Sequence, residues 1–176
     1  MIHLKTERIT IEMTNIEFKK LHNFERGTIY KLLKDAYSFD KRYYQADGAK
    51  WKNEADDFFF DNPHIADSCV FITTINNEPI GVAMWDPRNL PEEAIIGHNC
   101  IIPKYKGYGY GKAQMQEAVN RILQKGAKRI TVSTNADLIP AQRMYTSVGF
   151  KEVKREPVEA FFNEWIFYEY HIETKI

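Results

Sequence analysis

Apolar positions recur with two different periods along this chain of 176 residues. A spacing of three and four residues puts apolar side chains on one helix face, and it predicts helices at 28–37, 51–59, 115–125 and 141–148. Alternation, or a short β-branched and aromatic run, predicts strands at 7–13, 69–75, 79–85, 95–102, 130–134, 150–155 and 165–172. The segment 38–48 shows neither period and predicts a turn-rich connection. This order of elements indicates an α+β fold, a mixed sheet with helices on both faces.

Turn residues mark the ends of several predicted elements. Asn76-Asn77 lies between two predicted strands and predicts a tight hairpin. Asn62-Pro63 ends the second predicted helix, and Lys125-Gly126 ends the third.

The stretch 95–125 carries the strongest chemical signal. Its apolar strand stops at Pro103, and a turn containing Gly107, Gly109 and Gly111 leads into the third helix. Glycine allows positive φ and a close approach of the backbone to a ligand. The helix start adds unpaired N–H groups and the positive end of a dipole, about half a charge. Together these features predict an anion site, most often a phosphate site.

Two familiar phosphate loops do not match this turn. The P-loop needs glycine at position 106 and serine or threonine at 113, where the chain has Lys106 and Ala113. The dinucleotide motif needs a third glycine, and its place falls on Lys112 or Gln114. The phosphate ligand must therefore be of another kind.

Two motifs together resemble the GNAT superfamily of acetyl-CoA-dependent N-acetyltransferases. Lys106-x-x-Gly109-x-Gly111, after a strand ending in Ile-Ile-Pro, is similar to the family's coenzyme A pyrophosphate loop. Ala141, Tyr145 and Gly149-Phe150 are similar to its second signature, A-x-x-x-Y-x-x-x-G-F. The resemblance implies one N-acetyltransferase domain over 1–176, with a central mixed, largely antiparallel sheet flanked by helices on both faces.

The resemblance also implies the reaction and the coenzyme contacts. Acetyl-CoA would be the cosubstrate, and a primary amine of a small molecule, protein or peptide would attack it directly in a ternary complex. Many family members carry asparagine where this chain has Leu138, and Asn135 is the candidate replacement. The expected coenzyme-binding residues are Ile101, Ile102, Lys106, Gly107, Tyr108, Gly109, Tyr110, Gly111, Lys112, Asn135 and Ala141.

Attack on a thioester needs a deprotonated amine. At an amine pKa of about 10.4, deprotonation at pH 7 costs roughly 4–5 kcal/mol, so a general base is useful. His98 is the first candidate, because it lies in the central strand near the place of the family's thioester and titrates in the right range. A bulge at the neighbouring Gly97 could turn it to either face. Glu92, Glu93 and a water chain are the alternatives.

The leaving thiolate also needs help. Tyr145 matches the family's tyrosine, which acts as a general acid or as a hydrogen-bond donor to the sulfur. Proton transfer from a phenol of pKa ~10 to a thiolate of pKa ~8.5 is uphill by about 2 kcal/mol, which favours the hydrogen-bond role. Backbone N–H groups around 99–102 are candidates for stabilising the oxyanion.

Acidic and aromatic residues are concentrated between 40 and 61. One hypothesis makes them a wall for a cationic acceptor, and the alternative makes them a solvated acidic face over an aromatic core. The residues concerned are Asp40, Tyr43, Tyr44, Asp47, Trp51, Glu54, Asp56, Asp57 and Asp61.

Composition narrows the partners. With 24 basic and 24 acidic residues the net charge is zero, which argues against nucleic acid. No apolar run approaches the ~20 residues of a membrane span, and the start has no signal-peptide core, so we expect no membrane partner and a cytoplasmic location.

Cys69 and Cys100 are expected to be reduced thiols, and the scattered histidines predict no metal site. The aromatic stretch 161–165 is a candidate homodimer contact, or else packs on the domain itself.

Two other functions would explain part of the same motifs. A non-catalytic acyl-CoA sensor or regulatory module would keep the glycine-rich turn but would not need the Tyr145 hydroxyl. A phosphate-binding protein unrelated to acyl transfer would leave the second signature unexplained. The sequence does not identify the acceptor amine, since one fold carries many functions.

Overall fold

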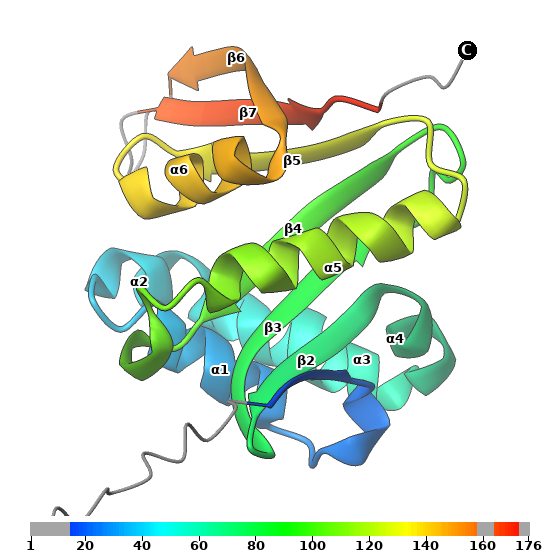
Figure 1. Ribbon diagram of the computed structural model, residues 1–176. Coiled ribbons are helices and arrows are strands. Elements are labelled where there is room, and N and C mark those ends of the chain that lie inside the picture. The colour runs from blue at the N-terminus through cyan, green and yellow to red at the C-terminus, as the bar shows by residue number, and fades with distance from the viewer. Residues whose placement is uncertain (1–14, 158–163, 173–176) are drawn as a thin grey trace, which may run out of the picture.

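The computed structural model describes residues 15–157 and 164–172. Within these residues a seven-stranded sheet has the order β1-β2-β3-β4-β5-β7-β6, and its one parallel pair is β4–β5 (Figure 1). The strands are β1 Ile16–Lys19, β2 Val70–Ile75, β3 Glu78–Asp86, β4 Ala94–Ile101, β5 Ile130–Asn135, β6 Phe150–Pro157 and β7 Glu164–Tyr170. The predicted mixed, largely antiparallel sheet is therefore confirmed.

Helices cover both faces of the sheet. Figure 1 shows α5 and α6 on one side of it and the N-terminal helices on the other. The bounds are α1 Thr28–Ala36, α2 Lys41–Lys50, the π-helical η2 Trp51–Asp57, α3 Phe58–Asp61, α4 Pro63–Cys69, α5 Tyr110–Gln124 and α6 Ile139–Val148, with short 3-10 turns η1 Leu21–Asn23 and η3 Pro103–Tyr105.

The periodic helices pack as their apolar spacing predicts. α1 buries Ile29, Leu32 and Leu33 on one side of the sheet, and α5 buries Met115 and Ile122 on the other. Strand β2 lies between these layers and is buried along its whole length. The hydrophobic core therefore extends over both faces of the central strands.

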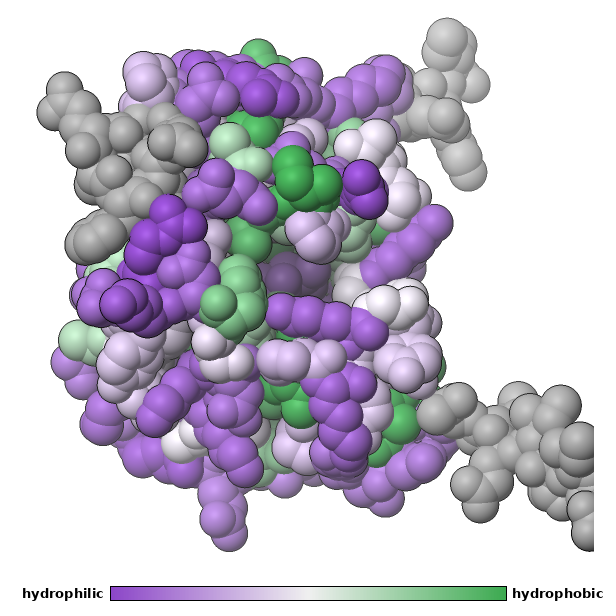
Figure 2. Space-filling model, turned by 90° about the vertical axis from the view of Figure 1, so that its left-hand side faces the viewer, coloured by the Kyte–Doolittle hydropathy of each residue, from purple (hydrophilic) through white to green (hydrophobic). Residues whose placement is uncertain are grey.

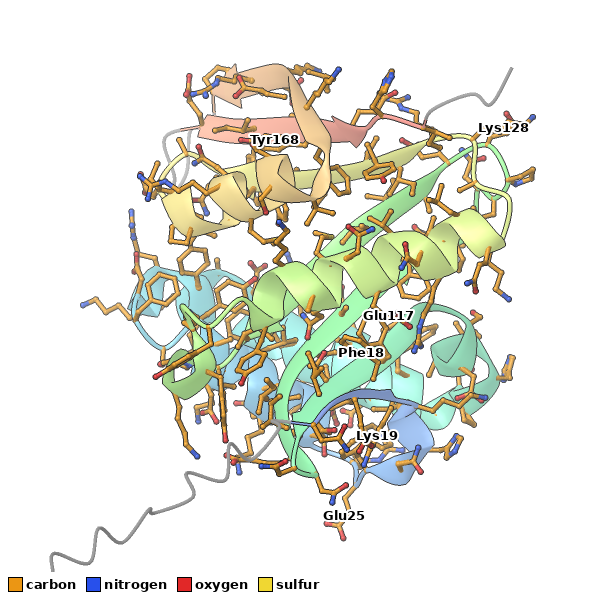
Figure 3. All side chains as sticks on the ribbon, viewed as in Figure 1. Phe18, Lys19, Glu25, Glu117, Lys128 and Tyr168 are labelled. Carbon is orange, nitrogen blue, oxygen red and sulfur yellow. The ribbon has the colours of Figure 1, made fainter. Side chains whose placement is uncertain are left out.

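The edge strand β1 is held by the far end of α5. Arg121 Nη2 donates a hydrogen bond to the Phe18 carbonyl at 3.4 Å, and Arg121 Nε donates to Glu117 at 2.7 Å. Figure 3 shows Phe18 on β1 and Glu117 on α5. The guanidinium carbon also lies 4.4 Å from the centroid of the Phe71 ring. These contacts connect the first described strand to the helix that begins at the glycine-rich turn.

The prediction of a turn-rich connection at 38–48 is wrong, because α2 begins at Lys41. This helix buries little more than Tyr43 and Gly48, so its sequence lacks an apolar period. The signal that was missed is a cap: the Asp40 side chain accepts a hydrogen bond from the Arg42 backbone N–H at 2.9 Å.

The helix α4 was also missed. Asn62-Pro63 does end α3, as predicted, but Pro63 is also the first residue of α4. Proline suits that position because its missing N–H group would have no partner in the first helical turn.

The predicted turns and most strands are confirmed. Asn76 and Asn77 both have positive φ, 48° and 68°, as the two central residues of a type I′ hairpin require. Gly126 follows α5 with φ of 78°. The strand predicted at 7–13 and most of the aromatic stretch 161–165 lie outside the described residues.

Candidate active site

The strands β4 and β5 pair over only a short length and then separate. Residues 94–96 of β4 face residues 130–132 of β5, and beyond them the two strands have no mutual pairing. A cavity of about 1090 Å³ occupies this separation, lined from β4, β5, α6, the glycine-rich turn and the segment from α1 to η2. Figure 2 looks onto the side where α2, this turn and α6 lie, and shows a hollow bordered by hydrophobic and hydrophilic residues.

The glycine-rich turn has the backbone that its sequence predicts. Gly107 and Gly109 have φ of 86° and 85°, and a Cβ added at either would meet no atom within 4 Å. Gly109 is the N-cap of α5 and no side chain caps that helix. The N–H groups of the first helical turn are therefore available for an anion at the edge of the cavity.

Most of the predicted coenzyme residues meet at this cavity. Ile102, Tyr108 and Tyr110 do not line it, and Tyr108 is 73% exposed. Arg143, an exposed cation on α6, lines the cavity and was missed, although it lies inside the second motif. The predicted residues that do line it are Ile101, Lys106, Gly107, Gly109, Gly111, Lys112, Asn135 and Ala141.

The Lys106 side chain joins the turn to the opposite wall of the cavity. Its Nζ donates a hydrogen bond to the Ala36 carbonyl, 2.9 Å away, and lies 4.7 Å from the centroid of the Phe39 ring. The ammonium thus stabilises the negative end of α1. Burial lowers the pKa of Lys106.

His98 lies at a bulge in β4. Between the pairs Ala83–Asn99 and Trp85–Ile96, β4 has one residue more than β3. His98 lines the cavity, and its ring centroid lies 6.2 Å from that of Tyr37 and 6.4 Å from that of Trp51. Burial lowers the pKa of His98, an effect that the Asp47 carboxylate opposes. His98 is therefore neutral at pH 7 and able to accept a proton.

The two glutamates considered as alternative bases lie at the other end of β4. Glu92 accepts from Lys128 Nζ at 2.6 Å, and Glu93 accepts from Thr131 Oγ1 at 3.1 Å. Figure 3 shows Lys128 at the end of the molecule beyond the C-terminus of α5. Neither glutamate lines the cavity.

Tyr145 lines the cavity from α6 and is 5% exposed. Its ring packs edge-on against Tyr168, with centroids 5.5 Å apart, and against Phe150 at 6.0 Å. Burial raises the pKa of Tyr145 well above its usual range. The hydroxyl therefore stays protonated at neutral pH and can act as a hydrogen-bond donor.

Comparison with known proteins agrees with this geometry. The model of the acetyltransferase (GNAT) family matches residues 28–150. The chain belongs to this family. The match spans both the glycine-rich turn and the Tyr145 motif, which lie on opposite sides of the cavity between β4 and β5.

Individual relatives are distant. A [ribosomal protein bS18]-alanine N-acetyltransferase from Haemophilus influenzae is 28% identical over 78 residues, 44% of this chain and 51% of that protein. The match thus spans about half the length of that relative. A PaiA N-acetyltransferase from Thermoplasma acidophilum, solved with coenzyme A, has a TM-score of 0.71 at 15% identity, covering 90% and 99% of the two chains.

A second solved structure shares the fold. A GNAT family acetyltransferase from Elizabethkingia anophelis, with acetyl-CoA bound, has a TM-score of 0.63 at 16% identity, covering 92% of this chain and 99% of its own. At these identities the likeness establishes the GNAT fold alone.

The wall of the cavity that lies opposite the glycine-rich turn is lined by aromatic rings and one carboxylate. Of the residues considered between 40 and 61, Tyr43, Asp47 and Trp51 line the cavity. Two more aromatic residues, Tyr37 and Phe39, were missed because they lie at and just after the end of α1. Burial holds the pKa of Tyr37 well above its usual range, and nearby Cys100 and Tyr145 add to this effect.

Other acidic residues of the same segment have structural roles. The buried Asp56 accepts hydrogen bonds from the Gly27 and Tyr30 backbone N–H groups and so caps α1. Asp57 and Asp61 form ion pairs with Arg26. The solvated-face hypothesis therefore fits Asp57 and Asp61, whereas Asp56 is a buried cap, and the acceptor-wall hypothesis is left with the residues of α2 and η2 that line the cavity.

Asn135, the predicted substitute for the family's asparagine, is almost fully engaged. Its Nδ2 donates to the Tyr43 hydroxyl at 2.7 Å, and its Oδ1 accepts from the Asp137 N–H at 3.1 Å. The side chain thereby joins β5 to α2. A single Nδ2 hydrogen remains for a ligand.

Within residues 15–157 and 164–172, no three His, Cys, Asp or Glu side chains are grouped as metal ligands would be. No helix in the same part of the chain is both long and apolar enough to cross a membrane.

Proposed function

We propose that this chain is an N-acetyltransferase that moves the acetyl group of acetyl-CoA to a primary amine. The observation that carries the proposal is the meeting of three elements at one cavity. The glycine-rich turn and the start of α5 supply backbone donors for phosphates, Tyr145 supplies a protonated hydroxyl, and His98 supplies a neutral base.

In the proposed reaction the amine nitrogen attacks the thioester carbonyl carbon. A C–N bond forms, the C–S bond breaks, and the electron pair of that bond leaves on the sulfur of coenzyme A. An acceptor that arrives as an ammonium group first loses one proton to His98, directly or through water, and His98 releases that proton to solvent. After the attack a second proton passes from the nitrogen to His98 and finally to the thiolate. The products are an N-acetyl amine, the coenzyme A thiol and one released proton, so atoms and charge balance.

Tyr145 would donate a hydrogen bond to the departing sulfur. A raised phenol pKa makes full proton transfer less favourable than for an ordinary tyrosine, so the hydroxyl stabilises the thiolate without being consumed. Hydrogen bonds to charged groups contribute about 1.5–3 kcal/mol.

The residues that line the wall from Tyr37 to Trp51 are suited to bind an amine that is a cation in solution. Asp47 and the rings of Tyr37, Phe39 and Trp51 offer a carboxylate and aromatic faces to an ammonium group.

The test is release of coenzyme A thiol from acetyl-CoA in the presence of polyamines, amino acids, aminoglycosides and short peptides. Thiol release with one amine class, together with the mass of its N-acetyl product, is the expected result. Tight acetyl-CoA binding without thiol release for any amine would instead favour the non-catalytic acyl-CoA sensor. Absence of acetyl-CoA binding would overturn both.

A further inference from the structure

A fully buried glutamine packs against strands β3 and β4. Gln114 projects from α5 and is 0% exposed. Its Nε2 lies 3.1 Å from the Val82 carbonyl and 3.2 Å from the Cys100 carbonyl, and its Oε1 lies 2.6 Å from Thr73 Oγ1. Gly81 makes room for it, because a Cβ there would lie 2.6 Å from Gln114 Oε1. A buried polar group this well partnered fixes its neighbours in one arrangement.

The orientation of the Gln114 amide follows from its partners. Backbone carbonyls can only accept hydrogen bonds, so the end that faces Val82 and Cys100 must be the donating NH₂ group. The same Nε2 lies 2.8 Å from an amide atom of Asn99, which must therefore be the accepting Oδ1. Gln114 thus determines which way the Asn99 amide points.

The free end of the Asn99 amide is directed away from Gln114. Gln114 lies over the β3 side of β4, where it contacts Val82 and Cys100, and the cavity lies on the β5 side. Asn99 lines that cavity and is partly exposed. In the described part of the chain its Nδ2 has no hydrogen-bond partner, so two N–H donors remain for a ligand.

We infer that Asn99 Nδ2 donates a hydrogen bond to a carbonyl oxygen of the acylated pantetheine arm of acetyl-CoA, with Gln114 as its positioning residue. This rests on the proposed function, since it needs acetyl-CoA in the cavity. The pantetheine amides and the thioester all present carbonyl acceptors. Leu138 offers no polar group, and Asn135 keeps only one N–H group beside its contacts with Tyr43 and Asp137, whereas both N–H groups of Asn99 Nδ2 remain for a ligand.

The first test replaces the donor and keeps the acceptor. Asn99→Asp still accepts from Gln114 Nε2 but has no N–H group to offer. We expect acetyl-CoA affinity, measured by titration calorimetry, to fall about tenfold. The matched control is Asn120→Asp, because Asn120 also accepts from a glutamine, Gln116, at 3.2 Å, but on the exposed surface of α5.

A second variant removes the polar network without adding charge. In Thr73→Val/Asn99→Leu/Gln114→Leu the three polar side chains are replaced together by apolar groups of similar shape, while the Val82 and Cys100 carbonyls lose their contact with Gln114 Nε2. We expect a folded variant with a moderately lower thermal midpoint and an acetyl-CoA affinity about tenfold lower. Wild-type affinity in this folded variant would overturn the inference and leave Gln114 a purely structural residue.

Comparison of two ligands locates the acceptor oxygen. Equal loss of affinity for coenzyme A and acetyl-CoA identifies a pantetheine amide, and loss for acetyl-CoA alone identifies the thioester carbonyl. A wild-type chain that binds neither ligand would refute the proposed function itself. Binding to the wild type and to both Asn99 variants with equal strength would refute only the role of Asn99.

Discussion

The wall from Ile101 to Lys112 presents mainly backbone to the cavity, whereas the wall from Tyr37 to Trp51 presents mainly side chains. In the first, glycines with positive φ and an uncapped helix start leave N–H groups facing a ligand. In the second, aromatic rings and the Asp47 carboxylate supply the surface. Lys106 joins the two walls through the Ala36 carbonyl.

The difference between these walls determines what each can recognise. A backbone site binds a group common to many ligands, such as a phosphate, and tolerates change in most side chains. A side-chain site depends on the identity of each residue and can be altered one residue at a time. Under the proposed function, substitution of glycines in the wall from Ile101 to Lys112 should therefore abolish coenzyme binding. Substitution of single side chains in the wall from Tyr37 to Trp51 should instead weaken binding of the amine.

The largest effect is expected from Gly109→Glu. A carboxylate at the N-terminus of α5 would occupy the anion site, and a side chain would be strained at a φ of 85°. Acetyl-CoA binding should be abolished, as measured by titration calorimetry. Gly111→Glu should act in the same way through its charge, although Gly111 does not have positive φ.

Gly126→Glu is the matched control for Gly109→Glu. Gly126 has a φ of 78° and an equally open surrounding, but it lies beyond the C-terminus of α5. Its substitution should cost similar stability and leave acetyl-CoA affinity unchanged. Equal affinity in the Gly109 and Gly126 variants would refute the phosphate-binding role of the turn.

His98→Gln should lower kcat/KM by roughly a hundredfold, the lower range for loss of a general base. Because burial lowers the pKa of His98, the wild-type rate should rise with pH through an inflection below 6.5, and the variant should lose this limb. A pH profile of kcat/KM from pH 5 to 9 measures both effects. If kcat/KM of the variant still rose with pH through the same inflection, His98 would not be the general base, and a water chain would accept the proton instead.

Tyr145→Phe should reduce kcat by roughly ten- to a hundredfold, with acetyl-CoA affinity retained, because it removes one hydrogen bond to a developing charge. Tyr168→Phe is the control, since Tyr168 packs against Tyr145 without lining the cavity. Steady-state kinetics of both variants separate turnover from affinity. Equal turnover in the two variants would leave Tyr145 as a core residue.

Sequence alone predicted the backbone wall well. Glycine at 107 and 109 is required by positive φ, and the apolar period of α5 follows from burial against the sheet, so both leave a pattern in the residues. The bulge that carries His98 was anticipated from Gly97, and its presence is now established. Asn76-Asn77 likewise specified its hairpin through two positive φ angles.

The side-chain wall could not be predicted in the same way. α2 buries too few residues to show a helical period, and the cavity residues Tyr37, Phe39 and Asp47 are separated by residues that face elsewhere. Gln114 interrupts an apolar helix face, and its role depends on Thr73, Val82 and Asn99 from three separate strands. Such contacts between distant segments have no local signature.

Asp47→Asn is the smallest change to the acceptor wall and should produce the smallest effect. The Asp47 side chain is 39% exposed and already forms an ion pair with Lys50 at 3.2 Å, so water and salt weaken its attraction for an ammonium group. We expect the KM for the amine to rise a few-fold, acetyl-CoA affinity to stay unchanged, and the difference from wild type to shrink as salt is added. Glu54→Gln, an exposed acid on η2 outside the cavity, is the control. If both variants raised the amine KM equally, the attraction would come from the overall charge of this face, and the acceptor wall would owe its selectivity to its aromatic rings.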